Sequence, residues 1–330
     1  MNGTEYGGKG FGQLLVYPDG PNPWQLLNYR NDVSPIGMFE LLNETEGAIY
    51  AAGNVECISP IRIVEDGEVR TCIEVLLGYH YSRARVLYSF SKWDSSFDVE
   101  VTVCWNEKDK LLRMNFPNAF QNAQYFGQDM FGVKELKGNY ELVAQKWLMA
   151  VDTESERALS IINDCTYGLI VTDSGLQTSL LRAPAYTCHA IEDRTLLSQE
   201  RYHPRMDQGE ATFRFTVLAG NKSEVVELTD RKAQYKNESP LAVSYFPAGQ
   251  GNHQTMPFSV RGVRMDAMKK SDDGKAYILR LFNYKNEAVT AEIVIDRFKI
   301  NSKISFGGYE LKTLRVENGS LSEVSLLDEN

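Results

Sequence analysis

The chain has 330 residues, of which 43% are hydrophobic and 24% charged, a balance typical of a globular protein and not of a disordered or collagen-like one. Its 35 Lys and Arg residues against 44 Asp and Glu residues give a net charge of −9, which argues against binding to nucleic acid or to an anionic membrane, because both require positive charge. No run approaches the ~20 apolar residues of a membrane-spanning helix and no secretion signal is visible, so we expect a soluble protein that handles neutral ligands.

Alternation of apolar and polar residues predicts β strands along most of the chain. In residues 97–105 every odd-numbered side chain is large and apolar, so one face of this strand is expected in a core. Similar runs, in chain order, cover 69–77, 85–90, 142–148, 176–181, 212–217, 259–265, 277–282, 289–295 and 310–316. Turn residues such as Asp272-Asp273-Gly274 separate them, so the pattern predicts antiparallel sheets packed as sandwiches.

Helical patterns are few. Residues 118–130 are expected to form a short helix or an irregular crossover, and residues 223–235 a helix with Ser223 as its N-cap. A loop rich in Pro and Gly follows the second helix. We therefore predict a domain boundary between about 221 and 258, with a large β domain over 1–236 and a smaller β sandwich over 237–330.

The cysteines indicate a reducing compartment. Their number is odd, no Cys-x-x-Cys pair occurs, and several lie in apolar runs. We expect reduced thiols in the core of a cytoplasmic protein. The five are Cys57, Cys72, Cys104, Cys165 and Cys188.

No motif in the chain predicts a complete catalytic or metal site. The four histidines form no metal-binding pair, and there is no Gly-x-Ser-x-Gly nucleophile motif. The densest polar stretch, 188–193 followed by 202–207, has the residue types of metal ligands, but a loop of mixed charge is the commoner meaning of such a stretch. We therefore assign no catalytic residue and no metal ligand.

Two segments could instead bind a sugar. Asn163, Asp164 and Tyr167 lie between two strand-like runs, where they suit either a tight turn or contact with sugar hydroxyls and ring faces, and the turn is favoured. Trp24 lies in a loop bounded by prolines, where a sugar-stacking platform or apolar packing would both fit, and packing is favoured.

Five segments, in the same order, resemble α-mannosidases of glycoside hydrolase family 38. Residues 103–117 are similar to the family's Trp-x-Glu…Lys-Leu-Leu-Lys…Phe-Pro segment, and 145–147 with 158–168 to its Gln-x-Trp and Asn-Asp-x-Lys-Tyr-Gly segments. Residues 180–184 resemble its Leu-Leu-Arg-Ser-Pro, and 278–283 and 310–314 its C-terminal Val-Arg-Leu-x-Asn and Glu-Ile-x-Thr-Leu strands. The chain departs from the family at Thr166, where Lys is usual, and at Ala211, where the Asp-x-Gly-x-His motif that begins at Asp207 would have His.

The resemblance implies an all-β fold, namely a galactose-mutarotase-like supersandwich followed by a smaller β sandwich. It covers the C-terminal half of such enzymes, whose zinc and carboxylate nucleophile belong to an N-terminal half with no counterpart here. The resemblance therefore implies a non-catalytic half that helps to form the cleft for a mannose-containing glycan, with the missing catalytic domain as its partner and zinc only in that domain. The chain is expected to begin inside the supersandwich, as a fragment of a longer hydrolase or the product of a truncated gene.

The residues expected to face carbohydrate are Asn163, Asp164, Tyr167, Arg182 and Asp207. A direct structural pairing of Asp164 with Arg182 is the alternative to that role. A free-standing mutarotase-like epimerase would need a His acid and a carboxylate base, drawn from His189, His203, Asp193 and Asp207. A purely structural assembly module is the third hypothesis, and formation of a homo-oligomer is left open.

Overall fold

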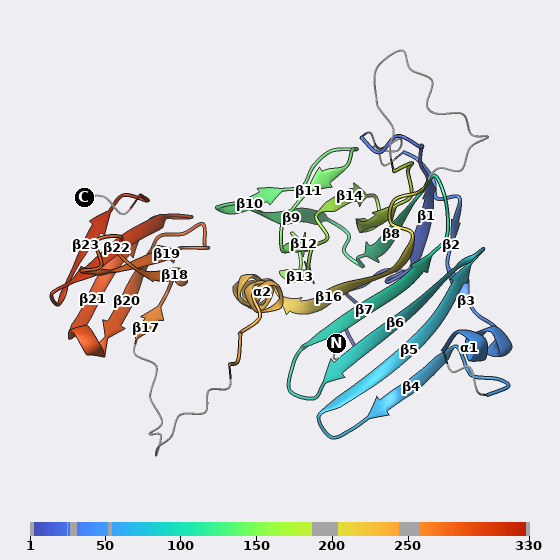
Figure 1. Cartoon of the computed structure of the whole chain (residues 1–330), viewed down its shortest axis with the longest axis horizontal. Coiled ribbons are helices and arrows are strands. Elements are labelled where there is room, and N and C mark those ends of the chain that lie inside the picture. The colour runs from blue at the N-terminus through green and yellow to red at the C-terminus, as the bar shows by residue number, and fades with distance from the viewer. Residues whose placement is uncertain are drawn as a thin grey trace, which may run out of the picture. The chain divides into compact units, whose positions relative to one another are not determined.

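The computed structural model of the chain describes residues 3–24, 26, 32–51, 55–186, 204–243 and 258–327. The chain divides into two compact units, each built mainly of β strands (Figure 1). Unit 1 comprises Met1–Gln128 and Lys134–Pro240, and unit 2 comprises Asp129–Val133 and Leu241–Asn330. No helix in these described ranges is long and apolar enough to cross a membrane.

The described part of unit 1 forms two antiparallel sheets. Their strands, in chain order, are β1 (Leu14–Pro18), β2 (Gly37–Met38), β3 (Glu40–Leu41), β4 (Ile61–Asp66), β5 (Arg70–Tyr79), β6 (Ser82–Ser91), β7 (Ser96–Trp105), β8 (Lys110–Pro117), β9 (Ala123–Asp129), β10 (Gly132–Glu135), β11 (Leu142–Val143), β12 (Trp147–Asp152), β13 (Arg157–Asn163), β14 (Gly168–Thr172), β15 (Gly175–Arg182) and β16 (Gly209–Asn221). The six-stranded sheet has the order β11-β14-β15-β8-β1-β2. The ten-stranded sheet has the order β10-β9-β12-β13-β16-β7-β6-β5-β3, with β4 also paired to β5.

The main hydrophobic core lies between these two sheets. The predicted alternation in β7 is confirmed, because Val99, Val101 and Val103 are buried in this core and Trp105 is fully buried with them. Across the interior, the rings of Phe116 in β8 and Phe215 in β16 pack edge to face, with centroids 5.3 Å apart. Burial of one face of β7 is what gives its sequence a period of two, whereas β8, β12 and β13 are buried on both faces along almost their whole length.

Burial of the core-facing side chains decreases toward one edge of the ten-stranded sheet. The strand registers place Phe215, Val99, Tyr88, Ile73 and Ile63 in one row across β16, β7, β6, β5 and β4. The first two are buried, the next two are partly buried, and Ile63 is 61% exposed. The core therefore ends between β6 and β4.

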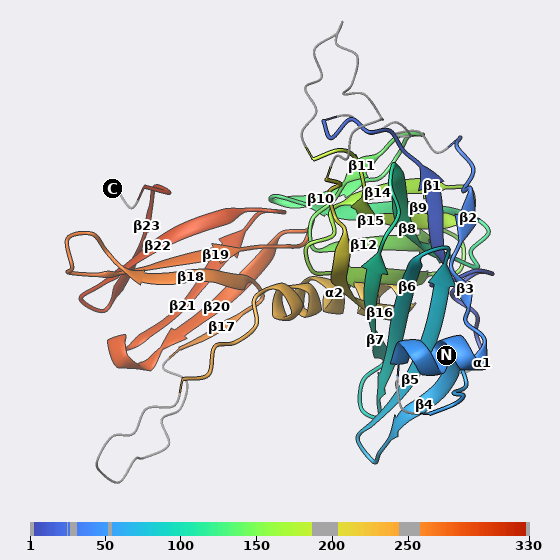
Figure 2. The same cartoon turned by 45° about the vertical axis from the view of Figure 1, so that its right-hand side comes forward.

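The described residues of unit 1 include two helices. The helix predicted at 223–235 is confirmed as α2 (Lys222–Asn237), but its N-cap is Asn221 instead of Ser223, since the Asn221 side chain accepts a hydrogen bond from the Ser223 N–H. The other, α1 (Glu44–Ala51), was not predicted. It packs on the face of β5 that points away from the core (Figure 2), where a Cβ added at Gly47 would lie 3.5 Å from the Leu76 side chain.

The helix or crossover expected at 118–130 is wrong for most of this stretch. Residues 123–129 form β9, which pairs with β12 from Ala123↔Asp152 to Gly127↔Leu148. A Cβ at Gly127 would lie 2.7 Å from the Ala144 side chain, so close packing requires glycine here. Pairing with a distant strand decides the structure of this segment, which its local pattern does not reveal.

Unit 2 is a smaller β sandwich. Its strands are β17 (Ser259–Arg261), β18 (Arg264–Lys270), β19 (Tyr277–Phe282), β20 (Val289–Ile295), β21 (Ile300–Phe306), β22 (Leu311–Glu317) and β23 (Ser320–Val324), with a 3₁₀ turn η1 (Asp296–Phe298). A sheet of order β17-β20-β21 and a sheet of order β18-β19-β22-β23 enclose a second core around Leu281, Ile293 and Phe306.

The described cysteines form no disulfide. Cys72 is buried as expected, but Cys57 and Cys165 are exposed, so the prediction of core thiols is wrong for these two. Cys188 lies outside the described residues.

Candidate functional site

The first predicted group of residues lies in the turn that joins β13 to β14. Asn163 is fully buried, and its side chain donates to the Gln145 carbonyl at 3.0 Å and accepts from the Thr166 N–H at 3.1 Å. Asn237 of α2 donates to the Asn163 carbonyl at 2.8 Å. Asn163 therefore supports the turn, and its side chain does not reach solvent.

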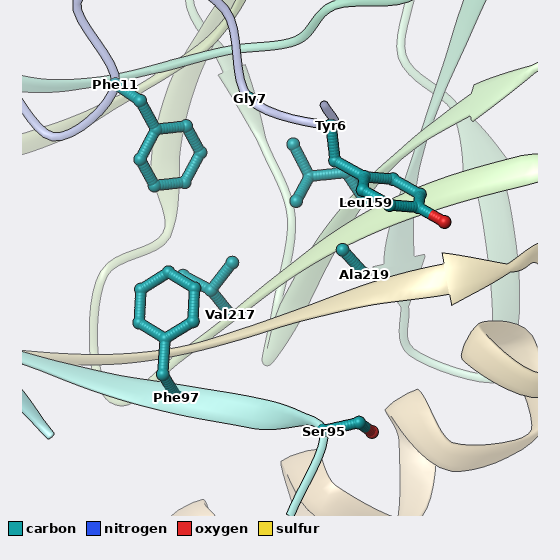
Figure 3. A pocket seen from close by; sticks show the side chains of 8 residues that line it. All are labelled: Tyr6, Gly7, Phe11, Ser95, Phe97, Leu159, Val217 and Ala219. Atoms are coloured by element: carbon teal, nitrogen blue, oxygen red, sulfur yellow. The ribbon is translucent and has the colours of Figure 1, made fainter. Parts of the chain in front are cut away.

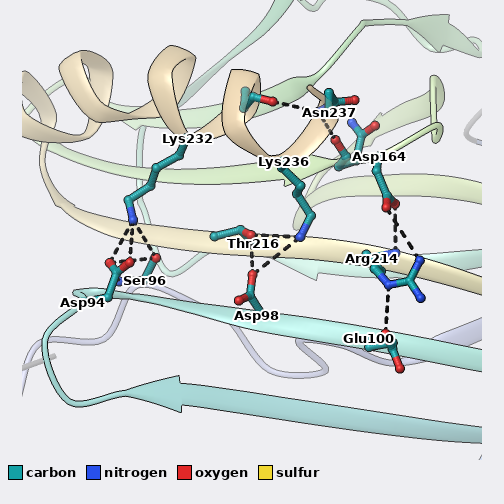
Figure 4. A network of polar contacts seen from close by, with 12 residues as sticks. Asp94, Ser96, Asp98, Glu100, Asp164, Arg214, Thr216, Lys232, Lys236 and Asn237 are labelled. Atoms are coloured by element: carbon teal, nitrogen blue, oxygen red, sulfur yellow. Dashed lines mark hydrogen bonds and ion pairs between the residues drawn. The ribbon is translucent and has the colours of Figure 1, made fainter. Parts of the chain in front are cut away.

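Asp164, the next residue, faces a neighbouring arginine. Its carboxylate accepts from the Arg214 backbone N–H at 3.2 Å and lies 4.0 Å from the Arg214 guanidinium, which also donates to Glu100 at 2.8 Å (Figure 4). Cys165 adopts a left-handed φ of 66° in this turn. The side chain of Tyr167, two residues later, is 49% exposed. Asp164 and Tyr167 thus remain accessible to a ligand.

Lysines of α2 extend this network and fix the helix on β7 and β16 (Figure 4). Lys232 donates to Asp94 at 2.6 Å, and Lys236 donates to Thr216 at 3.0 Å. Burial of Asp94 opposes ionisation, but hydrogen bonds from Lys232 and Ser96 outweigh it and hold the pKa of this carboxyl below its usual 3.8. These ion pairs position α2 and provide no acid or base for chemistry.

The second predicted group surrounds Arg182 at the end of β15. Its guanidinium donates to the buried carboxylate of Asp19 at 2.6 Å and to the Asn22 carbonyl at 3.1 Å. Its backbone N–H donates to the Asp207 carboxylate at 2.9 Å. Arg182 therefore ties the loop at 19–24 to the six-stranded sheet, and its own N–H is bound by Asp207.

A second ion pair lies beside it. The Arg205 guanidinium lies 3.3 Å from the Asp109 carboxylate, and the Asp109 carbonyl accepts from the Asp19 N–H at 3.0 Å. Asp109 Oδ1 and Arg205 Nη1 are buried and have no hydrogen-bond partner in the described part of the chain. We call Asp19, Asp109, Arg182, Arg205 and Asp207 the Arg182 cluster.

Trp24 is held in the loop that the Arg182 cluster fixes. Its backbone N–H donates to the Asn22 side chain at 2.9 Å, and Arg182 reaches the Pro23 carbonyl at 3.5 Å. The Trp24 side chain is 78% exposed, so it does not pack in a core, and of the packing expected for it only an interface stays a prediction. An exposed indole on a braced loop is the arrangement that a stacking platform requires.

The structure thus separates the predicted residues into two groups. Asn163, Asp164 and Tyr167 belong to a turn after β13 of the ten-stranded sheet, whereas Arg182 and Asp207 meet at the end of β15 in the six-stranded sheet. Asp164 lies against Arg214 and Arg182 binds Asp19, so these two predicted residues do not pair with each other. Contact with carbohydrate stays a prediction for Asp164, Tyr167, Arg182 and Asp207, whereas the Asn163 side chain is buried and is bonded to Gln145 and Thr166.

Sequence reasoning missed Asp19, Asp109 and Arg205. Asp109 lies in the turn between β7 and β8 with a left-handed φ of 53°, and nothing in its neighbourhood points to Arg205, 96 residues later. The residues that an epimerase would need, apart from Asp207, are His189, Asp193 and His203, which lie outside the described residues.

The described residues do not fit the zinc that the family resemblance implies. Zinc takes three or four His, Cys, Asp or Glu ligands, and no three such side chains gather anywhere in the ranges that the structure describes. The carboxylates of Asp19 and Asp109 are already paired with arginines. Of the carboxylates in the Arg182 cluster, that of Asp207 is exposed and can accept hydrogen bonds from hydroxyl donors.

Comparison with known proteins gives consistent matches along the chain. The family model described as "Glycosyl hydrolases family 38 C-terminal domain" matches residues 14–193, and "Glycosyl hydrolases family 38 C-terminal beta sandwich domain" matches residues 262–329. The chain is 22% identical over 303 residues to alpha-mannosidase G of Dictyostelium discoideum, covering 77% of this chain and 26% of that protein. It is 33% identical over 91 residues to human alpha-mannosidase 2C1, covering 25% of this chain and 9% of that protein.

A solved structure extends the match to the fold. A protein in glycosyl hydrolase family 38 from Enterococcus faecalis superposes with a TM-score of 0.70 at 13% identity, over 93% of this chain and 40% of that chain. The chain therefore spans well under half the length of the proteins that it resembles. The predicted fold class, an all-β supersandwich followed by a smaller β sandwich, is confirmed.

Proposed function

Because the chain belongs to glycosyl hydrolase family 38, we propose that it forms the non-catalytic C-terminal half of an α-mannosidase-like glycosidase. The observation that carries this proposal is that two C-terminal domain models of one family match the two parts of the chain in order. In this proposal the chain contributes to the cleft for a mannose-containing glycan. An N-terminal catalytic domain supplies the nucleophile, the acid and the zinc.

Support for glycan contact comes from Trp24 and the Arg182 cluster. The exposed indole of Trp24 can stack on the apolar face of a sugar ring, and the exposed Asp207 carboxylate can accept from its hydroxyls. Arg182 binds both the loop that carries Trp24 and, through its N–H, Asp207. We therefore assign Arg182 a positioning role and Trp24 the contact with the sugar.

Hydrolysis needs a carboxylate pair at a set separation about the anomeric carbon, and binding alone does not accelerate bond cleavage. We accordingly propose that the chain alone does not hydrolyse α-mannosides. Purified protein should give no turnover of an aryl α-mannoside above a heat-killed control, with or without added zinc. Turnover that a single substitution in this chain abolishes would show a complete active site and contradict the proposal.

Glycan binding is tested with two tryptophan variants. We expect a mannose oligosaccharide to bind the unmodified chain, measured by saturation-transfer NMR, and Trp24→Ala to weaken it at least tenfold. Trp93→Ala is the matched control, because Trp93 is 72% exposed but lies in the turn between β6 and β7. Equal losses in both variants, or no binding by the unmodified chain, would contradict the assignment of Trp24.

We also propose a cytoplasmic location. The free thiols of the described cysteines support it, because disulfides are rare in a reducing compartment. Recovery of the protein from the cytoplasmic fraction of its source cells would test this location, and recovery from the secreted fraction would contradict it.

A further inference from the structure

Unit 1 contains an apolar hollow formed by residues other than those of the Arg182 cluster. It has a volume of about 200 Å³, and the rings of Phe11 and Phe97 point into it from opposite sides (Figure 3). Its floor belongs to the core face of the ten-stranded sheet, where Val217 pairs with Phe97 and Leu159 pairs with Ala219. The segment that carries Tyr6 and Phe11 forms the opposite wall.

A second hollow of about 360 Å³ adjoins the first and is more polar. Tyr6, Ser95 and Ala219 line both, and the second reaches Glu224 in the first turn of α2. The hydroxyl groups of Tyr6 and Ser95 make no hydrogen bond within the described residues. An apolar slot therefore opens into a mouth that carries free hydroxyls and a carboxylate.

The chemistry of the two hollows selects an amphiphilic ligand. The slot has room for roughly seven groups of the size of a water molecule, at ~30 Å³ each, which is about the size of a hexyl to octyl chain. Apolar walls exclude water and favour hydrocarbon. At the mouth the Glu224 carboxylate accepts hydrogen bonds from hydroxyls and repels an anionic headgroup.

We propose that these adjoining hollows bind a neutral glycoside with an apolar aglycone, with the sugar at Tyr6, Ser95 and Glu224 and the aglycone between Phe11 and Phe97. This site shares no residue with Trp24 or the Arg182 cluster. It therefore does not depend on the function proposed above, and the two can fail separately.

Octyl α-mannoside below its micelle concentration is the probe, with methyl α-mannoside and octyl sulfate for comparison. By titration calorimetry we expect octyl α-mannoside to bind at least tenfold more tightly than either of the other two. Ala219→Phe, which fills the slot, should weaken binding of octyl α-mannoside at least tenfold. Trp24→Ala should leave it unchanged, because that residue belongs to the other site.

A measurement on the unmodified chain tests the proposal even if the Ala219→Phe variant does not fold. Nuclear Overhauser contacts should join the octyl chain to the rings of Phe11 and Phe97 when phenylalanine is selectively labelled. The proposal is overturned if these contacts are absent, if octyl sulfate binds as tightly as the mannoside, or if a folded Ala219→Phe protein binds the mannoside unchanged.

Discussion

Replacing Arg182 with alanine should destabilise unit 1 by about 3 kcal/mol. The substitution removes the guanidinium from the Asp19 carboxylate, whose side chain is fully buried, and frees the loop at 19–24 from its bonds to Arg182. Loss of one partner of a buried ion pair costs about 3–5 kcal/mol, because the other charge stays desolvated. Arg182 itself is 23% exposed, so water reaches part of the site and the lower end of this range applies.

Tryptophan fluorescence during urea unfolding measures the loss of stability of unit 1 separately from unit 2. All four tryptophans of the chain, Trp24, Trp93, Trp105 and Trp147, belong to unit 1, so their emission follows that unit alone. With an unfolding slope of about 1–3 kcal/mol per M of urea, the midpoint should fall by about 1–3 M.

The matched control is Arg214→Ala. Arg214 is paired with Glu100, but the two side chains are 53% and 38% exposed, and such surface pairs contribute about 1 kcal/mol or less. If the two variants lose the same stability, burial of Asp19 does not set the cost and the reasoning fails.

Further substitutions test other parts of the fold. Asn221→Ala removes the N-cap of α2 and should lower the stability of unit 1 by about 1 kcal/mol in the same urea assay, whereas Ser223→Ala should cost less. Hydrogen bonds from Ser155 above all, and then from the Glu154 N–H and Arg157, lower the pKa of Asp152 from 3.8 to about 2. The ionised form of Asp152 therefore stabilises the native state above pH 3.8. Asp152→Asn should be less stable than the unmodified chain at pH 7, and this difference in stability should disappear as the pH falls toward 2. A difference in stability that does not depend on pH would contradict the prediction. Phe306→Ala should cost unit 2 about 3–5 kcal/mol, seen as faster amide exchange in β20 and β21, without moving the tryptophan transition of unit 1.

Strands with one buried face were predictable because burial itself imposes the alternation. The run at 289–295 coincides with β20, in which the buried Ala291, Ile293 and Ile295 alternate with more exposed residues. The run at 142–148 was not predictable as two strands, because β11 pairs in the six-stranded sheet while β12 pairs in the ten-stranded sheet. A single apolar run that passes from one sheet to the other keeps its composition, so its sequence gives no sign of the break.

The short helix α1 did have a signal in the sequence. The Asn43 side chain accepts from the Glu46 N–H at 2.9 Å, and the Glu46 carboxylate accepts from the Asn43 side chain at 2.9 Å. This arrangement resembles a capping box, and an Asn-x-x-Glu pattern before Ala48 predicts it. Its brevity and weak apolar stripe explain why periodicity alone missed it.

The candidate site was less predictable than the fold, because its partners are distant in the sequence. Asp19 lies 163 residues before Arg182, and Arg214 lies 50 residues after Asp164. The family resemblance identified Arg182 and Asp164, but only the side-chain contacts of the folded chain show which residues meet them. Exposure of Trp24 likewise follows from the loop at 19–24, whose bonds to Arg182 no local pattern encodes.

The decrease in burial toward β4 has a consequence for the behaviour of the protein in solution. Ile61 and Ile63 are 50% and 61% exposed on a strand at the sheet edge, and such edges are templates for intermolecular strand pairing. Glu65 and Asp66 at the end of β4 and Glu68 in the adjoining turn are all exposed and place carboxylates beside these side chains. Charged residues that flank an apolar strand act as gatekeepers against aggregation, so replacing these three residues with uncharged Gln or Asn should promote fibrillar association through β4.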